Sequence, residues 1–346
     1  MKPKIHLLQK EQLSDYISAI AWSPQNNTLA ACSAKGELIL SQPNTALVYL
    51  HRERDVSLNG LGFSSQGEFL ATAGQNGILE VWQIKDDSPQ LIFQQQYPSV
   101  WIDTLTWHPQ KALLAYGVGR EVYILSLLDQ TIYARFSFQN SSVLSLAWHP
   151  QGNYLAVGGH GGVKIWSLND REAPPQLLEV PGASLSVAWS QEGRYLASGN
   201  LDRTLTILEW EAPPPWLMQG FPGKVPQVVW GNSTSPLVAA ACTNGITLWW
   251  RNQTDQQWQN SVLDPHQGFV KDFCFHPQQP FLVSAGNDGK IVLSQLKSMK
   301  TKTLITAKSG FSRLSWHPQG NYLAAGTSTG ELFIGEFFLQ GKKGFG

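Results

Sequence analysis

One pattern recurs eight times along the chain and constrains its fold more than any other feature. In each copy a short apolar segment ends at a Trp or Phe, a polar turn follows, and a segment of small apolar residues comes next. These aromatic residues, called the anchors, are Trp22, Phe63, Trp107, Trp148, Trp189, Trp230, Phe275 and Trp316. Neighbouring anchors are 41 to 45 residues apart. A period of this length predicts one supersecondary unit copied in tandem, and we number the units first to eighth by their anchors.

Each unit is predicted to consist of short antiparallel strands. The apolar segment before the anchor is only about six residues long and is bounded by turn residues, which favours a strand over a helix. Tight turns such as Asn76 with Gly77, or Asp288 with Gly289, separate the next two segments. Such residue pairs tolerate the positive φ angles of two-residue hairpin turns. A looser polar stretch leads to a fourth segment, so the prediction is an all-β chain with four strands per unit.

This period and strand pattern resemble the WD40-repeat family of β-propellers over nearly the whole chain. The family's Trp-Asp dipeptide is absent from the sequence. Blades of the family also contain a hydrogen-bonded tetrad of His, Ser or Thr, Asp and Trp. Only the seventh unit has most of it, as His266, Ser284 and Asp288, with Leu293 where Trp is expected. The resemblance therefore implies a propeller whose blade-stiffening network is mostly missing and whose stability comes from apolar stacking between blades.

We expect one closed domain over residues 1–346, built from eight four-stranded blades. The eighth unit lacks a fourth strand of its own, and the segment from Lys4 to Gln9 has strand character. We predict that residues 1–10 supply the outer strand of the last blade, which closes the ring and leaves no free edge. A ring of seven blades with one unit outside it is the alternative. Residues 340–346 are expected to form a tail, either a frayed end or a docking peptide.

The composition argues against several classes of function. Charged residues make up 14% of the chain, and 25 basic residues balance 25 acidic ones. Nucleic-acid binding needs clustered Lys and Arg, so no such partner is expected. The first ten residues lack the apolar core of a secretory signal, and direct membrane insertion is not expected either. With no such signal, Cys32, Cys242 and Cys274 fit free buried thiols, and the prediction is a cytoplasmic protein.

Three patterns that look catalytic or metal-binding have simpler structural explanations. Ser328 lies in a G-x-S-x-G sequence, but between two predicted strands rather than at the strand-to-helix turn of a nucleophile elbow. The trio of His266, Ser284 and Asp288 is assigned to the structural tetrad rather than to a catalytic triad. One histidine follows each of four anchors: His108, His149, His276 and His317. Equivalent positions on different blades cannot converge on one ion, so these are assigned to turns, and no catalytic residue, metal or cofactor is predicted.

The family resemblance implies that partners dock on the face around the central channel. Loops that enter the first strand of each unit, and turns between the second and third strands, form that face. The residues there that we predict to hold a partner are Tyr16, Trp101, Asp103, Arg120, Arg203, Phe269, Lys271 and Arg313. Trp101, Phe269 and Arg313 are the predicted main contacts, because exposed aromatic rings beside Arg are typical of interface hot spots. The alternative is that the aromatic rings plug the channel mouth as part of the core.

The predicted function is a protein–protein interaction scaffold or assembly factor that docks other proteins on this face. The alternative is a small-ligand-binding or enzymatic propeller that uses the channel mouth. Its candidate residues, Asp103, His160, Lys271 and Asp272, are spread over three different units. A fold alone does not decide between these functions.

Overall fold

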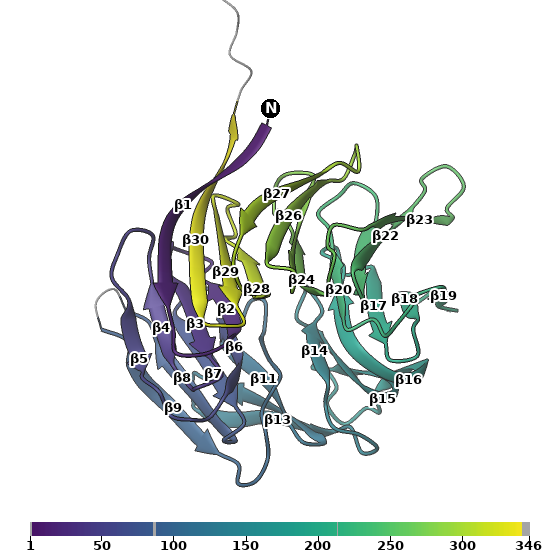
Figure 1. The fold of residues 1–346 in the computed structure, drawn as a ribbon. Coiled ribbons are helices and arrows are strands. Elements are labelled where there is room, and N and C mark those ends of the chain that lie inside the picture. Colours follow the sequence, from purple (N-terminus) through teal and green to yellow (C-terminus); the bar gives the residue numbers. More distant parts are fainter. Residues whose placement is uncertain (1, 86–87, 213, 341–346) are drawn as a thin grey trace, which may run out of the picture.

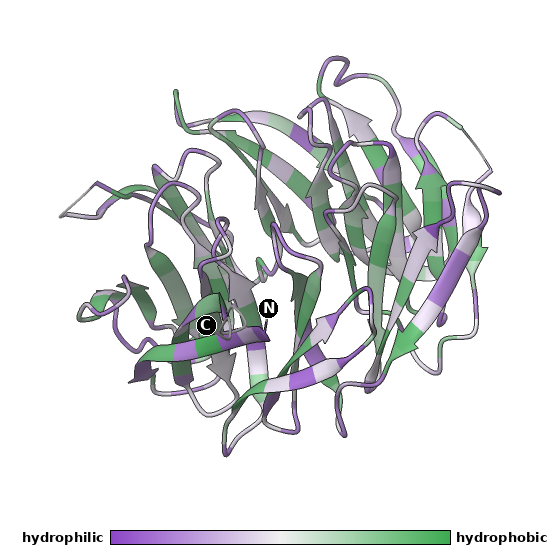
Figure 2. Cartoon of the chain, turned by 90° about the horizontal axis from the view of Figure 1, so that it is seen from above, coloured by the Kyte–Doolittle hydropathy of each residue, from purple (hydrophilic) through white to green (hydrophobic). Residues whose placement is uncertain are grey.

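The computed structural model describes residues 2–85, 88–212 and 214–340, and the predicted tail from residue 341 lies outside them. Thirty strands, β1 to β30, make up the regular structure of these ranges. Figure 1 shows them as a ring around which the chain colour runs once from purple to yellow. Seen from above, hydrophobic residues concentrate along the strands (Figure 2). Within the described ranges no helix is long and apolar enough to cross a membrane.

The innermost strand of every unit ends at its anchor. These inner strands are β2 (Ile17–Trp22), β6 (Leu58–Phe63), β10 (Leu105–Trp107), β14 (Ser145–Trp148), β16 (Gln176–Trp189), β20 (Gln227–Trp230), β24 (Val270–Phe275) and β28 (Phe311–Trp316). Each contacts the inner strand of the next unit, and β28 contacts β2, so the cycle of inner strands is closed.

The remaining strands extend each unit outward in antiparallel order. The second strands are β3 (Leu29–Ser33), β7 (Phe69–Gly74), β11 (Leu113–Val118), β15 (Tyr154–Ser167), β17 (Tyr195–Asn200), β21 (Leu237–Cys242), β25 (Phe281–Gly286) and β29 (Tyr322–Thr327). The third strands are β4 (Leu38–Ser41), β8 (Ile78–Gln83), β12 (Glu121–Ser126), β18 (Leu205–Glu209), β22 (Gly245–Arg251), β26 (Lys290–Gln295) and β30 (Glu331–Gln340). The outer strands are β5 (Val48–His51), β9 (Gln90–Gln96), β13 (Thr131–Ser137), β19 (Trp216–Met218), β23 (Trp258–Leu263), β27 (Thr301–Thr306) and β1 (Lys2–Gln12).

Apolar clusters hold consecutive units together. One cluster joins the third and fourth units through Phe136, Trp148 and Trp166, and another joins the seventh and eighth through Leu293, Trp316 and their neighbours. Comparable clusters lie between the other consecutive pairs, the eighth and first included. Burying one large side chain of this kind contributes about 1.5–3 kcal/mol, so inter-unit packing is a main source of stability.

The two ends of the described chain meet in one sheet. Strand β1 pairs antiparallel with β30 from Lys2 opposite Gln340 to Gln12 opposite Glu331. The N-terminal segment thus occupies the outer position of the eighth unit that the sequence analysis assigned to it. In Figure 1 the purple and yellow strands lie side by side. The outermost strand of this sheet is therefore the first of the chain, and the three inside it are the last.

Hydrogen bonding does not give the eight separate sheets that we predicted. The described strands form seven sheets, six of four strands and one of six, in the order β14-β15-β16-β17-β18-β19. The six-stranded sheet contains the fourth and fifth units. The cause is the length of β15 and β16, fourteen residues each, because no irregular loop interrupts either strand. His160 pairs with Ala183 at a position where the strands of the other units have ended. The number of sheets equals that of the seven-blade alternative, but all eight inner strands lie in the ring.

Candidate functional site: the face around the channel mouth

Backbone hydrogen bonds fix the loops that enter the inner strands. In five units the residue six positions before the anchor accepts a bond from the turn between the second and third strands of its own unit. Examples are Ala34 N–H to Tyr16 O at 2.9 Å and Asn287 N–H to Phe269 O at 3.0 Å. In four units, the third and the seventh among them, the next residue donates to the preceding unit, as in Ile102 N–H to Gly74 O at 3.1 Å. The predicted binding loops are therefore held on a rigid frame.

Trp101 projects from this frame beside a cavity. Its side chain is 59% exposed, so it is not a plug in the core. The cavity, of about 320 Å³, lies between the third and fourth units and is lined by Ser99, Val100, Trp101, Asp103, Gly117, Gly119, Ser142 and Val143. A Cβ on Gly117 would lie 2.9 Å from Val143, so glycine keeps this wall open. Asp103 is exposed and accepts a hydrogen bond from Asn59 Nδ2 at 2.7 Å.

Phe269 projects in the same way from the loop before β24 and is 57% exposed. Lys271, two residues later, is also exposed. The third and seventh units are four steps apart in the closed cycle of eight inner strands. The strands that follow Trp101 and Phe269, β10 and β24, do not contact each other, so the two residues cannot form one compact hot spot.

Some of the other predicted residues are exposed, and one is hydrogen-bonded within the fold. Arg120 and Arg203 are exposed on turns between second and third strands, and Tyr16 is half-buried. Arg313 is half-buried, and its Nε donates to Ser18 O at 2.6 Å while Nη1 donates to Ser312 O at 3.0 Å. The Arg313 guanidinium is thus used to join the eighth unit to the first.

Sequence reasoning missed a belt of polar side chains that joins neighbouring inner strands. Each belt residue is the third before its anchor. Ser145 Oγ accepts from Val187 N at 3.0 Å, and Ser186 Oγ accepts from Val228 N at 3.2 Å. The belt continues through Gln227 and Asp272 to Arg313. The signal was a run of polar residues at one repeat position, Thr104, Ser145, Ser186, Gln227, Asp272 and Arg313.

Asp272 is the most constrained member of the belt. Its carboxylate accepts from Gln227 Nε2 at 2.7 Å, from Phe273 N at 2.8 Å and from Leu314 N at 2.9 Å. Burial raises the pKa of Asp272, and the charge of Arg313 together with these hydrogen bonds opposes the rise. The hydrogen bonds that the Asp272 carboxylate accepts therefore join the sixth, seventh and eighth units.

The tetrad remnant of the seventh unit is assembled. His266 Nε2 lies 2.8 Å from Ser284 Oγ, and His266 Nδ1 lies 3.0 Å from Asp288 Oδ1. Burial lowers the pKa of His266 despite the neighbouring carboxylate. The fourth position is Leu293, which is fully buried. The trio spans the loop before β24, strand β25 and the turn after it, as a stiffening network requires.

Other units replace the tetrad with polar networks that the sequence analysis did not predict. In the first unit the buried Glu37 accepts from Ser14 N at 2.8 Å and from Ser33 Oγ at 2.8 Å. Glu80 of the second unit is hydrogen-bonded to His51, a buried side chain at the end of β5 in the first unit. In the fifth unit Asn200 Nδ2 donates to Thr204 and Thr206, both at 2.9 Å. The blade-stiffening function is therefore kept with different residues.

The remaining catalytic and metal-like patterns lie in structural positions. Ser328 sits in the turn between β29 and β30, where its N–H donates to Gly310 O at 2.8 Å. His108, His149, His276 and His317 each pack against the anchor of the following unit. Within the part of the chain that the structure describes, no cluster of three or more His, Cys, Asp or Glu side chains could hold a metal ion.

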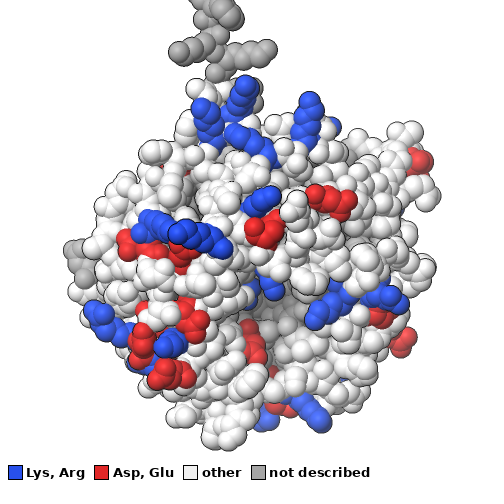
Figure 3. All heavy atoms as spheres, viewed as in Figure 1, with Lys and Arg blue, Asp and Glu red and all other residues white. Residues whose placement is uncertain are grey.

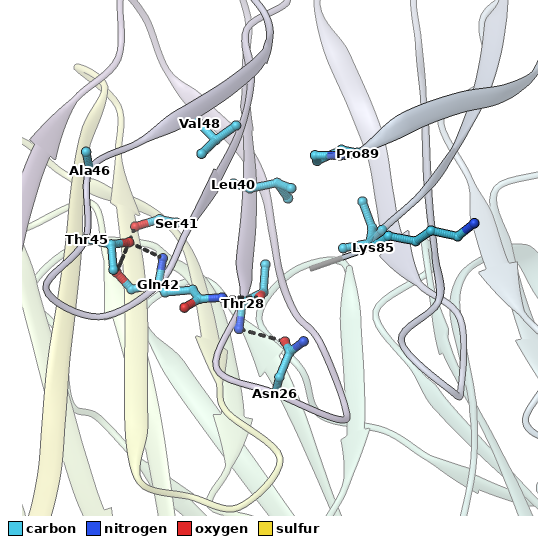
Figure 4. Close-up of a pocket in the computed structure, with 11 residues that line it drawn as sticks. Asn26, Thr28, Leu40, Ser41, Gln42, Thr45, Ala46, Val48, Lys85 and Pro89 are labelled. Atoms are coloured by element: carbon cyan, nitrogen blue, oxygen red, sulfur yellow. Dashed lines mark hydrogen bonds between the residues drawn. The ribbon is translucent and has the colours of Figure 1, made fainter. Parts of the chain in front are cut away.

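Further cavities lie toward the outside of the ring. Figure 4 shows one of about 210 Å³ between the first and second units. Its polar lining is largely satisfied, since Gln42 Nε2 donates to Thr28 Oγ1 at 3.2 Å and Thr45 Oγ1 donates to Gln42 O at 3.0 Å. A cavity of about 570 Å³ between the sixth and seventh units includes Trp250 and Met299. Two others include Arg52 and Leu177 respectively. None of these four contains the exposed aromatic residues of the mouth.

Family models match more than half of the chain in separate segments. Residues 20–110 match the anaphase-promoting complex subunit 4 WD40 domain, and residues 130–167, 178–208 and 258–293 match the WD domain, G-beta repeat. The chain belongs to the WD40-repeat family. Six of the eight anchors lie within the matched segments, in WD40 repeats that lack the Trp-Asp dipeptide.

Solved WD40 propellers share the fold at low sequence identity. Sqt1 from Chaetomium thermophilum, in a crystal structure bound to the N-terminus of the ribosomal protein L10, matches with a TM-score of 0.82 and 17% identity over 94% of this chain and 97% of that chain. A structure of Sqt1 without that peptide in its description gives a TM-score of 0.83 and 17% identity over 96% and 98%. Protein HIR1 from Yarrowia lipolytica is 26% identical over 119 residues, 30% of this WD40 chain and 11% of HIR1. The match thus spans about a tenth of HIR1.

Proposed function

We propose that this WD40 propeller is a scaffold or assembly factor that docks partner proteins on the face around its channel mouth. One observation carries the proposal: Trp101 and Phe269 are more than half exposed on loops that backbone hydrogen bonds tie to neighbouring turns. In a ring of eight units the two side chains stand at opposite sides of the mouth. Exposed aromatic side chains held by a fixed backbone lose little entropy on binding, which is why they dominate interface hot spots. An extended segment of a partner that crosses the mouth would contact both.

The cavity beside Trp101 defines the chemistry of one contact. An indole ring and the side chains of Val100 and Val143 offer apolar walls, and Asp103 supplies a carboxylate at the rim. A Lys or Arg side chain of the partner would place its methylenes on these walls and its charge near Asp103, with a cation–π contribution from Trp101. Arg313 is not part of this proposal, because its guanidinium is bonded to Ser18 and Ser312.

The similarity to Sqt1 supports the class of function. That propeller has been crystallised bound to the N-terminus of a ribosomal protein, so a ring of this fold can hold a segment of another protein. The alternative of an enzyme or small-ligand site is weaker on the geometry. Asp272 has three donors on its carboxylate, which commits it to the structure, and Asp103, His160 and Lys271 come from different units and do not line one cavity.

We also infer that the six-stranded sheet is two blades joined at one edge and that the ring has eight blades. Leu168 N–H donates to Asn153 O at 2.9 Å, the same bond that Leu127 makes to Ala112 at 3.0 Å at the base of a separate blade. An apolar cluster with Trp189 lies between the fourth and fifth units as between other units. A crystal structure with seven inner strands around the axis would overturn this inference, and with it the opposed placement of Trp101 and Phe269.

The test is affinity capture of the tagged full-length chain from its native cell. The wild type is compared with Trp101→Ala/Phe269→Ala and with a matched control, Leu128→Ala/Val262→Ala, which removes two exposed apolar side chains away from the mouth. The proposal predicts a defined protein retained by wild type and control and reduced at least about tenfold by the Trp101/Phe269 variant. Equal capture by the folded variant would contradict the site, and capture of no protein by the wild type would favour the small-ligand alternative.

A further inference from the structure

A group of lysines surrounds the point where β1 meets β27, outside the channel mouth. Lys302 Nζ donates to Pro3 O at 2.8 Å, which places Lys302 next to Lys2 and Lys4. Lys300 is two residues before Lys302, and all four lysines are exposed. None of the ion pairs found in the described ranges involves any of them. Figure 3 shows basic side chains gathered at the upper edge of the molecule, over this part of the ring.

The same edge presents an apolar side chain. Phe338 lies opposite Lys4 in the register of β1 and β30 and is 43% exposed. The nearest carboxylate in that register is Glu336, opposite His6. We call Lys2, Lys4, Lys300, Lys302 and Phe338 the basic edge.

We propose that the basic edge adsorbs the propeller to an anionic phospholipid surface, without insertion of the chain into the bilayer. Figure 1 shows the paired ends of β1 and β30 reaching beyond the neighbouring strands, so that a flat surface can touch them. Lysines near an anionic membrane each strengthen binding by roughly fivefold, and an exposed aromatic ring can enter the headgroup region. The chain's balanced net charge does not prevent this, because remote charges are screened beyond about 10 Å at 0.1 M salt.

Two other anionic partners fit the geometry less well. The four lysines line none of the five cavities described above, so they offer no groove for an acidic peptide. Duplex nucleic acid is typically held through roughly six to ten phosphate contacts along a stripe, and this edge has four lysines at the ends of two strands. A membrane needs neither a groove nor a stripe.

The experiment is co-sedimentation of the full-length chain with vesicles of phosphatidylcholine alone or with about 30 mol % phosphatidylserine, at low and high salt. We expect binding only to the anionic vesicles and a clear loss at high salt. Lys2→Glu/Lys4→Glu/Lys300→Glu/Lys302→Glu should lower the partition coefficient at least about 100-fold. Reversal of four other exposed lysines, Lys85, Lys111, Lys224 and Lys308, gives the same net charge and should change binding no more than about threefold.

Replacement of the four basic-edge lysines by Gln provides a second variant that keeps a hydrogen-bond donor at residue 302, and thermal unfolding checks that each variant folds. The salt titration of the wild type is informative whatever the variants do. Three results would overturn the proposal: no preference for anionic vesicles, equal binding by the basic-edge and control variants, or tighter binding to polyglutamate or duplex DNA than to vesicles at the same salt.

Discussion

The imidazole of His276 packs against the indole of Trp316, the anchor of the next unit, with ring centroids 4.7 Å apart. His276 Nδ1 accepts N–H bonds from Gln278 and Gln279, both at 3.1 Å. Because Nδ1 accepts, the ring carries its proton on Nε2 and is neutral. His108, His149 and His317 pack on the following anchors in the same way, at 5.0, 4.8 and 5.3 Å. The His-Pro turns, which the sequence explained only as turns, are joints between units.

These joints predict a loss of stability in acid. Burial lowers the pKa of His108, His276 and His317, so the unfolded chain takes up protons there at higher pH than the folded chain does. The free energy of unfolding should therefore be steady above neutral pH and fall as pH drops below about 6.5 toward the lowered pKa values. Urea unfolding between pH 5 and 8 measures this. His276→Phe should reduce the pH dependence, and His6→Phe, on an exposed strand position, should not.

A glycine of the next unit completes three of the four joints, those of His108, His149 and His276. Gly320 has φ +76°, and a Cβ there would lie 2.3 Å from Cε1 of His276. Gly320→Ala combines backbone strain with a collision in a packed joint, and we predict a cost of about 2–4 kcal/mol. Gly161 is the control, because its φ is +87° but nothing lies within 4 Å of a Cβ. Gly161→Ala should cost only about 1 kcal/mol, and equal urea midpoints for the two variants would contradict the joint.

The indole hydrogen bonds between units predict that Trp→Phe substitution costs more stability at one anchor than at another. Trp107 Nε1 donates to Gly62 O at 2.8 Å, whereas Trp316 Nε1 is buried with no partner. Phe at either position loses similar packing, but only Trp107→Phe also leaves a carbonyl unpaired. We expect Trp107→Phe to destabilise the chain by about 1 kcal/mol more than Trp316→Phe. Thermal unfolding of both variants under one condition decides this, and a reversed order would count against the bond.

Much of this architecture was predictable because each repeat is marked in the sequence by a large aromatic residue, and such residues tend to be buried. All eight anchors end inner strands, and the N-terminal segment pairs with β30. The fusion of the fourth and fifth units was not predictable. It depends on whether the backbone around Pro181 and Gly182 keeps its pairing, and the residues there look like an ordinary turn.

The orientation of the candidate site residues was harder to predict for a different reason. Five inner strands have an irregular register between the fifth and third residues before the anchor, as at Phe311 and Arg313. A bulge re-aims the side chains that follow it, so simple alternation along a strand fails there. Trp101 and Phe269 precede the inner strands, so this irregularity does not affect them, and both are exposed. Arg313 follows the irregular step and is bonded instead to the first unit.

The orientation of Arg313 predicts that its substitution destabilises the chain, whereas substitution of an exposed arginine does not. Arg313 opposes the burial-raised pKa of Asp272, so its loss leaves the half-buried Asp272 carboxylate without a nearby positive charge. Arg313→Met should destabilise the chain by about 1–3 kcal/mol at neutral pH, while Arg120→Met, at an exposed turn, should stay within about 0.5 kcal/mol. Without Arg313 the folded-state pKa of Asp272 rises further, so the loss should grow as pH increases from about 4 toward 7.

A second substitution separates this structural role from partner binding. Asp272→Asn in the Arg313→Met background removes the orphaned charge and should recover part of the lost stability in urea unfolding. If Arg313 instead contacts a partner, Arg313→Met would leave stability nearly unchanged and abolish capture. A stable Arg313→Met chain that no longer binds its partner would therefore show that Arg313 belongs to the docking face. An unstable Arg313→Met chain that Asp272→Asn rescues would show that Arg313 belongs to the belt.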